Sequence, residues 1–197
     1  MASRDIHGLV LAGGKSKRMG RDKALLDRGG QSQLAYMVEL LGRHVDEVFV
    51  STSAELATDS ERSQYPLIID RFEDLGPVAG ILSAIKEYPE ADWLVVACDL
   101  PNIDDETIAN ILVQRDGEQY FTAYASSYDA LPEPLCALYH AGCADIIQAF
   151  VDDGMHCPRK ILIRSETLLL QQLHAASLDN VNTPADLQKN RVLQDNA

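Results

Sequence analysis

Apolar and polar positions along this chain follow two different periods. Short apolar runs of strand length occur at 9–12, 45–51, 66–69 and 93–98. Between them, apolar residues recur every three or four positions, as they do over 31–43, which is the spacing of one helix face. Strands that alternate with helices predict an α/β fold. We expect a three-layer, Rossmann-like arrangement with a mostly parallel central sheet and helices on both of its faces.

The pattern predicts further elements toward the C-terminus. Pro77 suits the first turn of a helix because it lacks the N–H that would have no partner there. Asp104 is an expected cap for a helix through about Gln114. The remaining expected elements are strands near 120–125, 133–139 and 168–170, helices at about 54–64 and 141–152, and a capping box formed by Thr183 and Asp186.

The chain has 197 residues, 46% of them hydrophobic, which is enough for one substantial core. We expect a single domain over 1–190 and a frayed tail over 191–197. No stretch approaches the roughly 20 apolar residues that span a bilayer, and no signal peptide is evident. The four cysteines form no C-x-x-C pair, which is typical of reduced thiols. These features predict a cytoplasmic protein.

The distribution of charge points to a small anionic ligand. A net charge of −13 would repel nucleic acid and membrane surfaces, so neither is expected as a partner. Residues 15–28 nevertheless contain six Lys or Arg against two Asp, a local charge of +4, directly after Gly13-Gly14. Glycines permit a tight turn and a close approach of backbone N–H groups to a ligand. This combination predicts a polyphosphate site rather than a solvated turn.

The spacing of this loop excludes two common phosphate-binding motifs. A Walker A loop requires G-x-x-x-x-G-K-[ST], but the fifth residue after Gly13 is Arg18 and the fifth after Gly14 is Met19. A dinucleotide fingerprint requires G-x-G-x-x-G, and no third glycine occurs before Gly20.

Other polar positions also fall at expected strand ends, where an open parallel sheet binds its ligands. Asp99 directly follows the most apolar predicted strand, and a carboxylate beside a triphosphate is a typical magnesium ligand. Asp70 follows another strand. For both aspartates the alternative is a structural contact within a turn. Gly76 and Gly80 flank a helix start, which either offers backbone N–H groups to an anion or base edge or forms a structural turn only.

The run from Leu11 to Lys23 reads L-A-G-G-x-S-x-R-M-G-x-D-K. It resembles the signature of nucleotidyltransferases that build molybdenum cofactor dinucleotides, and above all that of the molybdenum cofactor guanylyltransferase family. The resemblance covers almost the whole chain. Its later landmarks are Asp70-Arg71, Gly76-Pro77-x-x-Gly80-Ile81, Ala97-Cys98-Asp99-Leu100-Pro101, Pro134-Leu135-x-Ala137-Leu138-Tyr139 and Asn180-Val181-Asn182-Thr183-Pro184.

The resemblance implies an activity: transfer of GMP from GTP to the terminal phosphate of molybdopterin or its molybdenum-loaded form, with release of pyrophosphate and with Mg²⁺ as cofactor. It also implies roles for individual residues. Arg18, Lys23 and Asp99 would be catalytic, with Asp99 as the metal ligand, and Asn180 and Asn182 would lie on the acceptor side. The expected nucleotide-binding set is Leu11, Ala12, Gly13, Gly14, Lys23, Asp70, Gly76, Gly80 and Asp99.

Several alternatives stay open at this level. A cytidylyl branch acts on the same cofactor and tends to show L-A-A-G, so Gly13 favours guanine. A non-catalytic module that binds GTP or the pterin is a different class of function, but the presence of Lys23 and Asp99 argues against it.

Some family members have an asparagine where this chain has Ser51-Thr52-Ser53, so that nucleotide contact is open. Arg159-Lys160 is either a grip for the acceptor's phosphate or a surface patch. Cofactor-synthesis proteins or molybdoenzymes are expected as transient partners.

Overall fold

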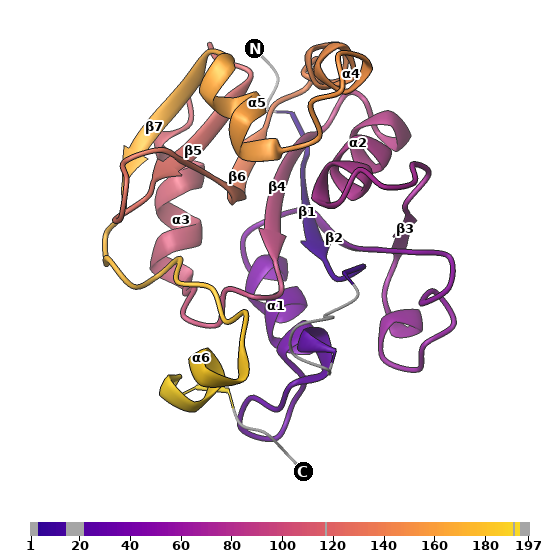
Figure 1. Ribbon diagram of the computed structural model, residues 1–197, viewed down its shortest axis with the longest axis vertical. Coiled ribbons are helices and arrows are strands. Elements are labelled where there is room, and N and C mark those ends of the chain that lie inside the picture. The colour runs from indigo at the N-terminus through magenta and orange to yellow at the C-terminus, as the bar shows by residue number, and fades with distance from the viewer. Residues whose placement is uncertain (1–3, 15–21, 117, 191, 194–197) are drawn as a thin grey trace.

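A computed structural model describes residues 4–14, 22–116, 118–190 and 192–193. Strands and helices alternate along most of them (Figure 1), and two short 3₁₀ helices, η1 and η2, follow β1 and β2 respectively. The elements in chain order are β1 (Ile6–Leu11), η1 (Lys23–Leu25), α1 (Gln33–Gly42), β2 (Glu47–Thr52), η2 (Arg62–Gln64), β3 (Leu67–Ile69), α2 (Pro77–Glu87), β4 (Asp92–Ala97), α3 (Asp105–Gln114), β5 (Phe121–Ala125), β6 (Pro132–Tyr139), α4 (Ala144–Asp152), α5 (Pro158–Arg164), β7 (Thr167–Gln171) and α6 (Pro184–Lys189).

The strands within these described residues form one seven-stranded sheet in the order β3-β2-β1-β4-β6-β5-β7. The pairs β1–β2, β1–β4, β2–β3 and β5–β7 are parallel. Strand β6 runs antiparallel to both of its neighbours, β4 and β5. The expectation of a mostly parallel α/β sheet is therefore confirmed. The four-stranded parallel part, β3-β2-β1-β4, brings the ends of its strands to one edge.

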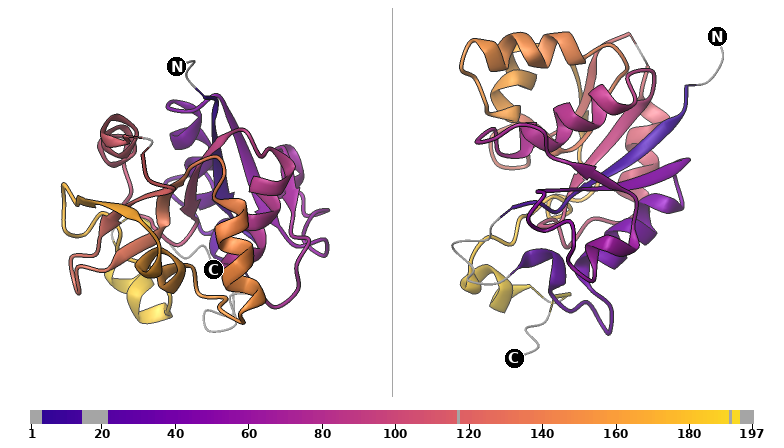
Figure 2. Two further views of the ribbon diagram at one scale, coloured as in Figure 1. Left: turned by 90° about the horizontal axis from the view of Figure 1, so that it is seen from above. Right: turned by 90° about the vertical axis from the view of Figure 1, so that its right-hand side faces the viewer.

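Helices cover both faces of the sheet (Figure 2). Helices α1 and α3 pack on one face against Val10, Val50 and Leu94, and helices α2, α4 and α5 pack on the other face against Leu9 and Trp93. Successive residues of β1 and β4 therefore point into opposite helical layers. Because both layers are apolar, the two strands consist of continuous hydrophobic runs. Each fully buried large apolar side chain contributes about 1.5–3 kcal/mol.

Side chains close the N-terminal ends of several helices. The Oγ of Ser32 accepts a hydrogen bond from the backbone N–H of Ala35 at the start of α1, and the Asp104 carboxylate accepts one from Thr107 at the start of α3. Thr183 and Asp186 form the expected capping box at α6. Within the part of the chain that the structure describes, no helix has the length and apolar character needed to cross a membrane.

One sequence expectation is corrected. The segment 54–64 was expected to be a helix, but it consists of turns and only its last residues form η2. Backbone turn bonds, such as the one from the N–H of Asp59 to the oxygen of Leu56, join its first part. The Asp59 carboxylate then accepts from the backbone N–H groups of Glu61 and Arg62, in place of helical bonds. Helix α5, which Pro158 begins, was not among the expected elements, and it carries the Arg159-Lys160 patch.

Candidate active site

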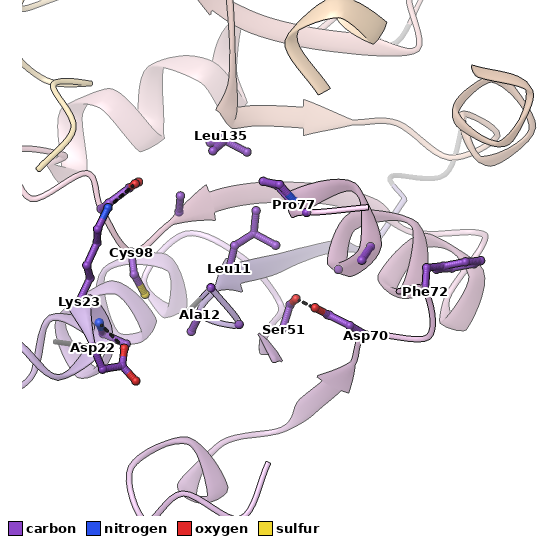
Figure 3. Close-up of a pocket in the computed structure, with 18 of the residues that line it drawn as sticks. Leu11, Ala12, Asp22, Lys23, Ser51, Asp70, Phe72, Pro77, Cys98 and Leu135 are labelled. Carbon is purple, nitrogen blue, oxygen red and sulfur yellow. Dashed lines mark hydrogen bonds and ion pairs between the residues drawn. The ribbon is translucent and has the colours of Figure 1, made fainter. Parts of the chain in front are cut away.

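The carboxyl-terminal edge of the parallel strands borders a cleft of about 610 Å³ (Figure 3). It is lined by all nine residues expected to bind a nucleotide: Leu11, Ala12, Gly13, Gly14, Lys23, Asp70, Gly76, Gly80 and Asp99. They come from positions up to 88 residues apart, and the sheet joins them because parallel neighbours end at the same edge. The volume suits a nucleotide-sized ligand.

Lys23 lies at one end of this cleft and holds two other segments of the chain. Its Nζ donates to Oδ1 of Asn182 at 2.6 Å and to Oδ2 of Asp99 at 3.2 Å. Lys23 stands on η1, whose first turn is capped by Asp22 through a 3.0 Å hydrogen bond from the backbone N–H of Ala24. The lysine side chain is only 17% exposed. A cation is thus fixed beside the strand-end carboxylate, where a phosphate oxygen would meet it.

Asp99 has one oxygen that fits a metal ion. Oδ1 is buried and has no hydrogen-bond partner within the described part of the chain, while Oδ2 faces Lys23. The backbone oxygen of Asp99 accepts from the N–H of Val181 at 2.9 Å, which fixes the residue in place. A buried oxygen without a donor is costly unless something binds it. Carboxylate oxygens are the ligands that Mg²⁺ prefers, so the residue fits this ion.

A metal at this point would need ligands besides the protein. Among the described residues, no group of three or more His, Cys, Asp or Glu side chains gathers into a metal-binding cluster. Magnesium is commonly held by one or two carboxylates together with substrate phosphates and water. The arrangement around Asp99 therefore suits an ion that arrives with a polyphosphate.

Asp70 lies across the cleft from Lys23 (Figure 3). Its Oδ1 accepts a 2.8 Å hydrogen bond from the Oγ of Ser51. Burial raises the pKa of Asp70, and the Ser51 hydrogen bond offsets part of that rise. Ser51, near the C-terminal end of β2, therefore holds a carboxylate on the cleft wall.

Gly13 is adjacent to this carboxylate. A Cβ added there would lie 3.2 Å from Oδ2 of Asp70 and 3.2 Å from the Cα of Thr52. Both distances are tighter than ordinary packing, so the glycine lets the loop backbone lie directly against β2 and Asp70.

The glycines at the start of α2 are required by packing and conformation. Gly76 has φ of +56°, which strains any residue with a Cβ. A Cβ at Gly80 would lie 2.0 Å from the Oγ of Ser51 and 3.1 Å from Cδ2 of Leu11. The first turn of α2 consequently lies against β1 and β2, and its backbone forms one wall of the cleft.

The structure separates the two asparagines expected on the acceptor side. Asn182 contacts Lys23 at the nucleotide cleft. Asn180 instead lines two neighbouring hollows, of about 550 and 230 Å³. The smaller hollow shares Leu135 with the nucleotide cleft, so the two spaces are adjacent. Arg159 also lines both hollows and pairs with Glu133 at 2.8 Å and Asp129 at 3.1 Å.

Arg18, the third expected catalytic residue, lies outside the described residues. Lys23 and Asp99 are therefore the members of that set that the structure brings together.

Sequence reasoning missed several residues of this region. Asp22, Phe72 and Leu135 line the cleft, and Arg62 lies buried behind it. Asp22 and Leu135 belong to the motifs that carry the family resemblance, but no sequence feature indicates which way their side chains point. Arg62 stood in a polar stretch with no apolar periodicity and gave no signal.

Comparison with known proteins adds independent findings. The family model described as "MobA-like NTP transferase domain" matches residues 8–169. The chain is 34% identical to the "Molybdenum cofactor biosynthesis bifunctional protein" of Synechocystis sp., over 92% of this chain and 52% of that protein, so it spans about half of that relative's length. It is 31% identical to the "Molybdenum cofactor guanylyltransferase" of Shewanella frigidimarina, over 93% of this chain and 94% of that protein.

A solved structure supports the fold. The "Molybdopterin-guanine dinucleotide biosynthesis protein A" of Archaeoglobus fulgidus superposes with a TM-score of 0.77 at 22% identity, covering 93% of this chain and 95% of that one. The family model spans the strands and helices that surround the cleft, from β1 into β7. This chain belongs to the MobA-like NTP transferase domain family.

Proposed function

We propose that this protein transfers GMP from GTP to the terminal phosphate of molybdopterin or its molybdenum-loaded form, and that pyrophosphate is released. The observation that carries the proposal is the contact of Lys23 with both Asp99 and Asn182 at the mouth of a nucleotide-sized cleft. This contact joins a phosphate-binding cation, a metal-binding carboxylate and the side expected to receive the acceptor.

The nucleotide would lie along the carboxyl ends of β1 and β3. Gly13, Gly14 and the first turn of α2 offer backbone groups to the base and ribose, and Asp70 faces them with a carboxylate that Ser51 holds in place. A carboxylate accepts hydrogen bonds only, so a guanine base, with its N–H donors, is a suitable partner for Asp70.

The triphosphate would extend toward Lys23. In the reaction, an oxygen of the acceptor's phosphate attacks the α-phosphorus of GTP, and the bond from that phosphorus to the bridging oxygen of the β-phosphate breaks. The electron pair leaves with pyrophosphate. Lys23 stabilises the charge that builds on the leaving group, and Arg18 is proposed to assist it. Mg²⁺ held by Asp99 would supply further charge neutralisation and alignment.

Alignment of the two substrates accounts for the remaining rate enhancement, because no residue needs to form a covalent intermediate. The acceptor would enter beside the nucleotide through the 230 Å³ hollow, whose wall includes Leu135 and Asn180. Arg159 on this wall is already paired with two carboxylates. Its charge is therefore balanced within the protein, and we assign Arg159 to shaping the wall of this hollow rather than to binding the acceptor's phosphate.

The names of the relatives agree with the guanine assignment. The Shewanella relative is named a molybdenum cofactor guanylyltransferase and the Archaeoglobus protein a molybdopterin-guanine dinucleotide biosynthesis protein. Gly13 is consistent with that branch.

The test has two stages. First, GTP, CTP and ATP are titrated calorimetrically into the purified protein with and without Mg²⁺. Then pyrophosphate release is measured with GTP and molybdopterin. We expect preferential binding of GTP, stronger with Mg²⁺, and pyrophosphate release that requires the acceptor.

The Asp99→Asn variant should lose release, whereas Asp105→Asn, an exposed carboxylate paired with Arg43 away from the cleft, should retain it. If the protein instead prefers CTP, the product would be the cytidylyl dinucleotide. Binding of GTP without acceptor-dependent release would contradict the catalytic role.

A further inference from the structure

Arg62 is a charged residue that is completely removed from solvent. Its exposed fraction is 0%, although it stands on a short 3₁₀ helix between β2 and β3 in a polar segment. A buried guanidinium costs several kcal/mol unless its donors are paired. The side chain therefore has to be explained by its contacts.

Those contacts converge on the glycine-rich loop from two directions. Nε and Nη2 of Arg62 donate to the backbone oxygen of Ala12 at 3.1 and 2.9 Å. Nη2 also donates to Oδ2 of Asp22 at 2.6 Å. Ala12 immediately precedes Gly13-Gly14, and Asp22 stands at the far end of the basic motif. One guanidinium thus holds both ends of the loop.

Asp22 also holds the turn that carries Lys23, the proposed catalytic lysine. The other carboxylate oxygen of Asp22 accepts from the backbone N–H of Ala24 and caps η1, the turn that carries Lys23. A continuous chain of hydrogen bonds therefore runs from Arg62 through Asp22 to the turn whose side chain reaches Asp99. Bidentate and charge-assisted bonds of this type fix geometry better than a single point charge does.

Arg62 also controls the charge of the cleft wall. Asp22 lines the cleft, whereas Arg62 does not. Without the guanidinium, Asp22 would present an uncompensated carboxylate to a triphosphate and would repel it. Nη1 of Arg62 pairs at 3.3 Å with a second carboxylate, Asp59, which does not line the cleft.

We infer that Arg62 is a positioning residue for nucleotide binding: it fixes the two ends of the loop, and so the turn that carries Lys23, without touching the nucleotide itself. The inference rests on the proposed use of this cleft for a nucleoside triphosphate. A residue that only stabilised the fold would not need to join Ala12 to Asp22.

The experiment uses three variants of the whole chain. Arg62→Lys keeps the charge but loses the planar fork. Asp22→Asn keeps an oxygen for the N–H of Ala24 and removes the ion pair. Asp59→Asn is the matched control, because it weakens a contact of the same guanidinium outside the loop. Calorimetric affinity for GTP, CTP and ATP is measured beside the free energy of unfolding.

We expect Arg62→Lys and Asp22→Asn to weaken binding of the preferred nucleotide at least tenfold, and Asp59→Asn to change it by less than twofold. Charge alone predicts the opposite result for Asp22→Asn: removing a carboxylate from the cleft should make an anionic nucleotide bind more tightly. Unchanged or tighter binding in Asp22→Asn, or an equal loss in Asp59→Asn, would overturn the inference. If Arg62→Lys does not fold, Asp22→Asn decides the matter.

The failure of the proposed function gives a different result. If the unsubstituted protein binds GTP but releases no pyrophosphate with acceptor, GMP transfer is contradicted while the affinities still test Arg62. If it binds none of the three nucleotides, both proposals are overturned.

Discussion

The Nζ of Lys23 lies 2.6 Å from Oδ1 of Asn182, although 159 positions separate the two residues in the sequence. The same Nζ lies 3.2 Å from Asp99, and the backbone of Val181, next to Asn182, donates to the backbone oxygen of Asp99. The C-terminal segment before α6 therefore lies against the end of the cleft at which Lys23 and Asp99 stand. A residue expected to contact the acceptor thereby shares a hydrogen bond with the lysine expected to contact the phosphates.

We expect Lys23→Ala to lower kcat/KM by about 10²–10³, the effect of removing one preorganised charge-stabilising donor. The free energy of unfolding should fall by only about 1 kcal/mol, since the Lys23–Asp99 pair is partly exposed. Pyrophosphate release and denaturant unfolding measure the two effects. Lys86→Ala, which removes an exposed lysine bonded to Gln148, should leave release unchanged. Normal turnover in a folded Lys23→Ala protein would contradict the proposed role of Lys23 in stabilising the leaving group.

Asp99→Asn should abolish the effect of Mg²⁺ on GTP binding. Because the asparagine lacks the charge that holds a divalent cation, addition of Mg²⁺ should no longer strengthen GTP binding. Without Mg²⁺, GTP should bind at least as tightly as to the unsubstituted protein, since a negative charge has been removed beside the triphosphate. Calorimetric titration with and without Mg²⁺ measures both. A persistent Mg²⁺ enhancement would place the metal elsewhere.

Asn182→Ala and Asn180→Ala should differ. Asn182 contacts Lys23, so its loss should raise the KM for GTP as well as that for molybdopterin. Asn180 lines the neighbouring hollows and not the nucleotide cleft, so its loss should raise the KM for molybdopterin alone. Steady-state kinetics with each substrate varied in turn provides the comparison. Equal effects on the KM for GTP would contradict the separation of the two residues.

Gly80→Ala should destabilise the fold by about 1–3 kcal/mol, despite the better helix propensity of alanine, because the new methyl group overlaps the Ser51 hydroxyl. Rotation of that hydroxyl would also break its hydrogen bond to Asp70. Adding Ser51→Ala in the same chain removes the nearest clash and should restore part of the loss. The double variant is compared with both single variants by denaturant unfolding. Strict additivity would show that the two sites do not interact.

Asp70→Asn should stabilise the protein at neutral pH. Burial raises the pKa of Asp70 in the folded state, so the folded protein retains a proton that the unfolded chain has already lost. Stability attributable to this group therefore falls as pH rises from its unfolded pKa to its folded pKa, and stays lower above that range. The gain from Asp70→Asn should accordingly be greatest above the folded pKa, should shrink as the pH falls toward the unfolded pKa of about 3.9, and should be absent below it. Unfolding measured across this range checks the sign, and nucleotide affinity should fall even as stability rises.

The sequence by itself determined the framework of this protein. Continuous apolar runs such as 93–98 can be buried only between two layers, so the α/β class and the parallel sheet followed from the pattern. The predicted strands and the glycines after them then indicated that Gly13, Asp70 and Asp99 lie at the carboxyl-terminal edge of the sheet, since parallel strands end together. The helix starts could be predicted in the same way, because a capping Ser or Asp stands before apolar residues at helical spacing.

Only the tertiary structure decided which of these side chains meet. The contact between Lys23 and Asn182 is set by how the segment before α6 returns across the end of β4, and no local preference encodes that path. The segment 54–64 differs from the expected helix for the same reason: its conformation follows from Arg62 turning inward to the Ala12 carbonyl and the Asp22 carboxylate. A buried arginine surrounded by polar neighbours has no hydrophobic period, because its position is fixed by partners distant in sequence.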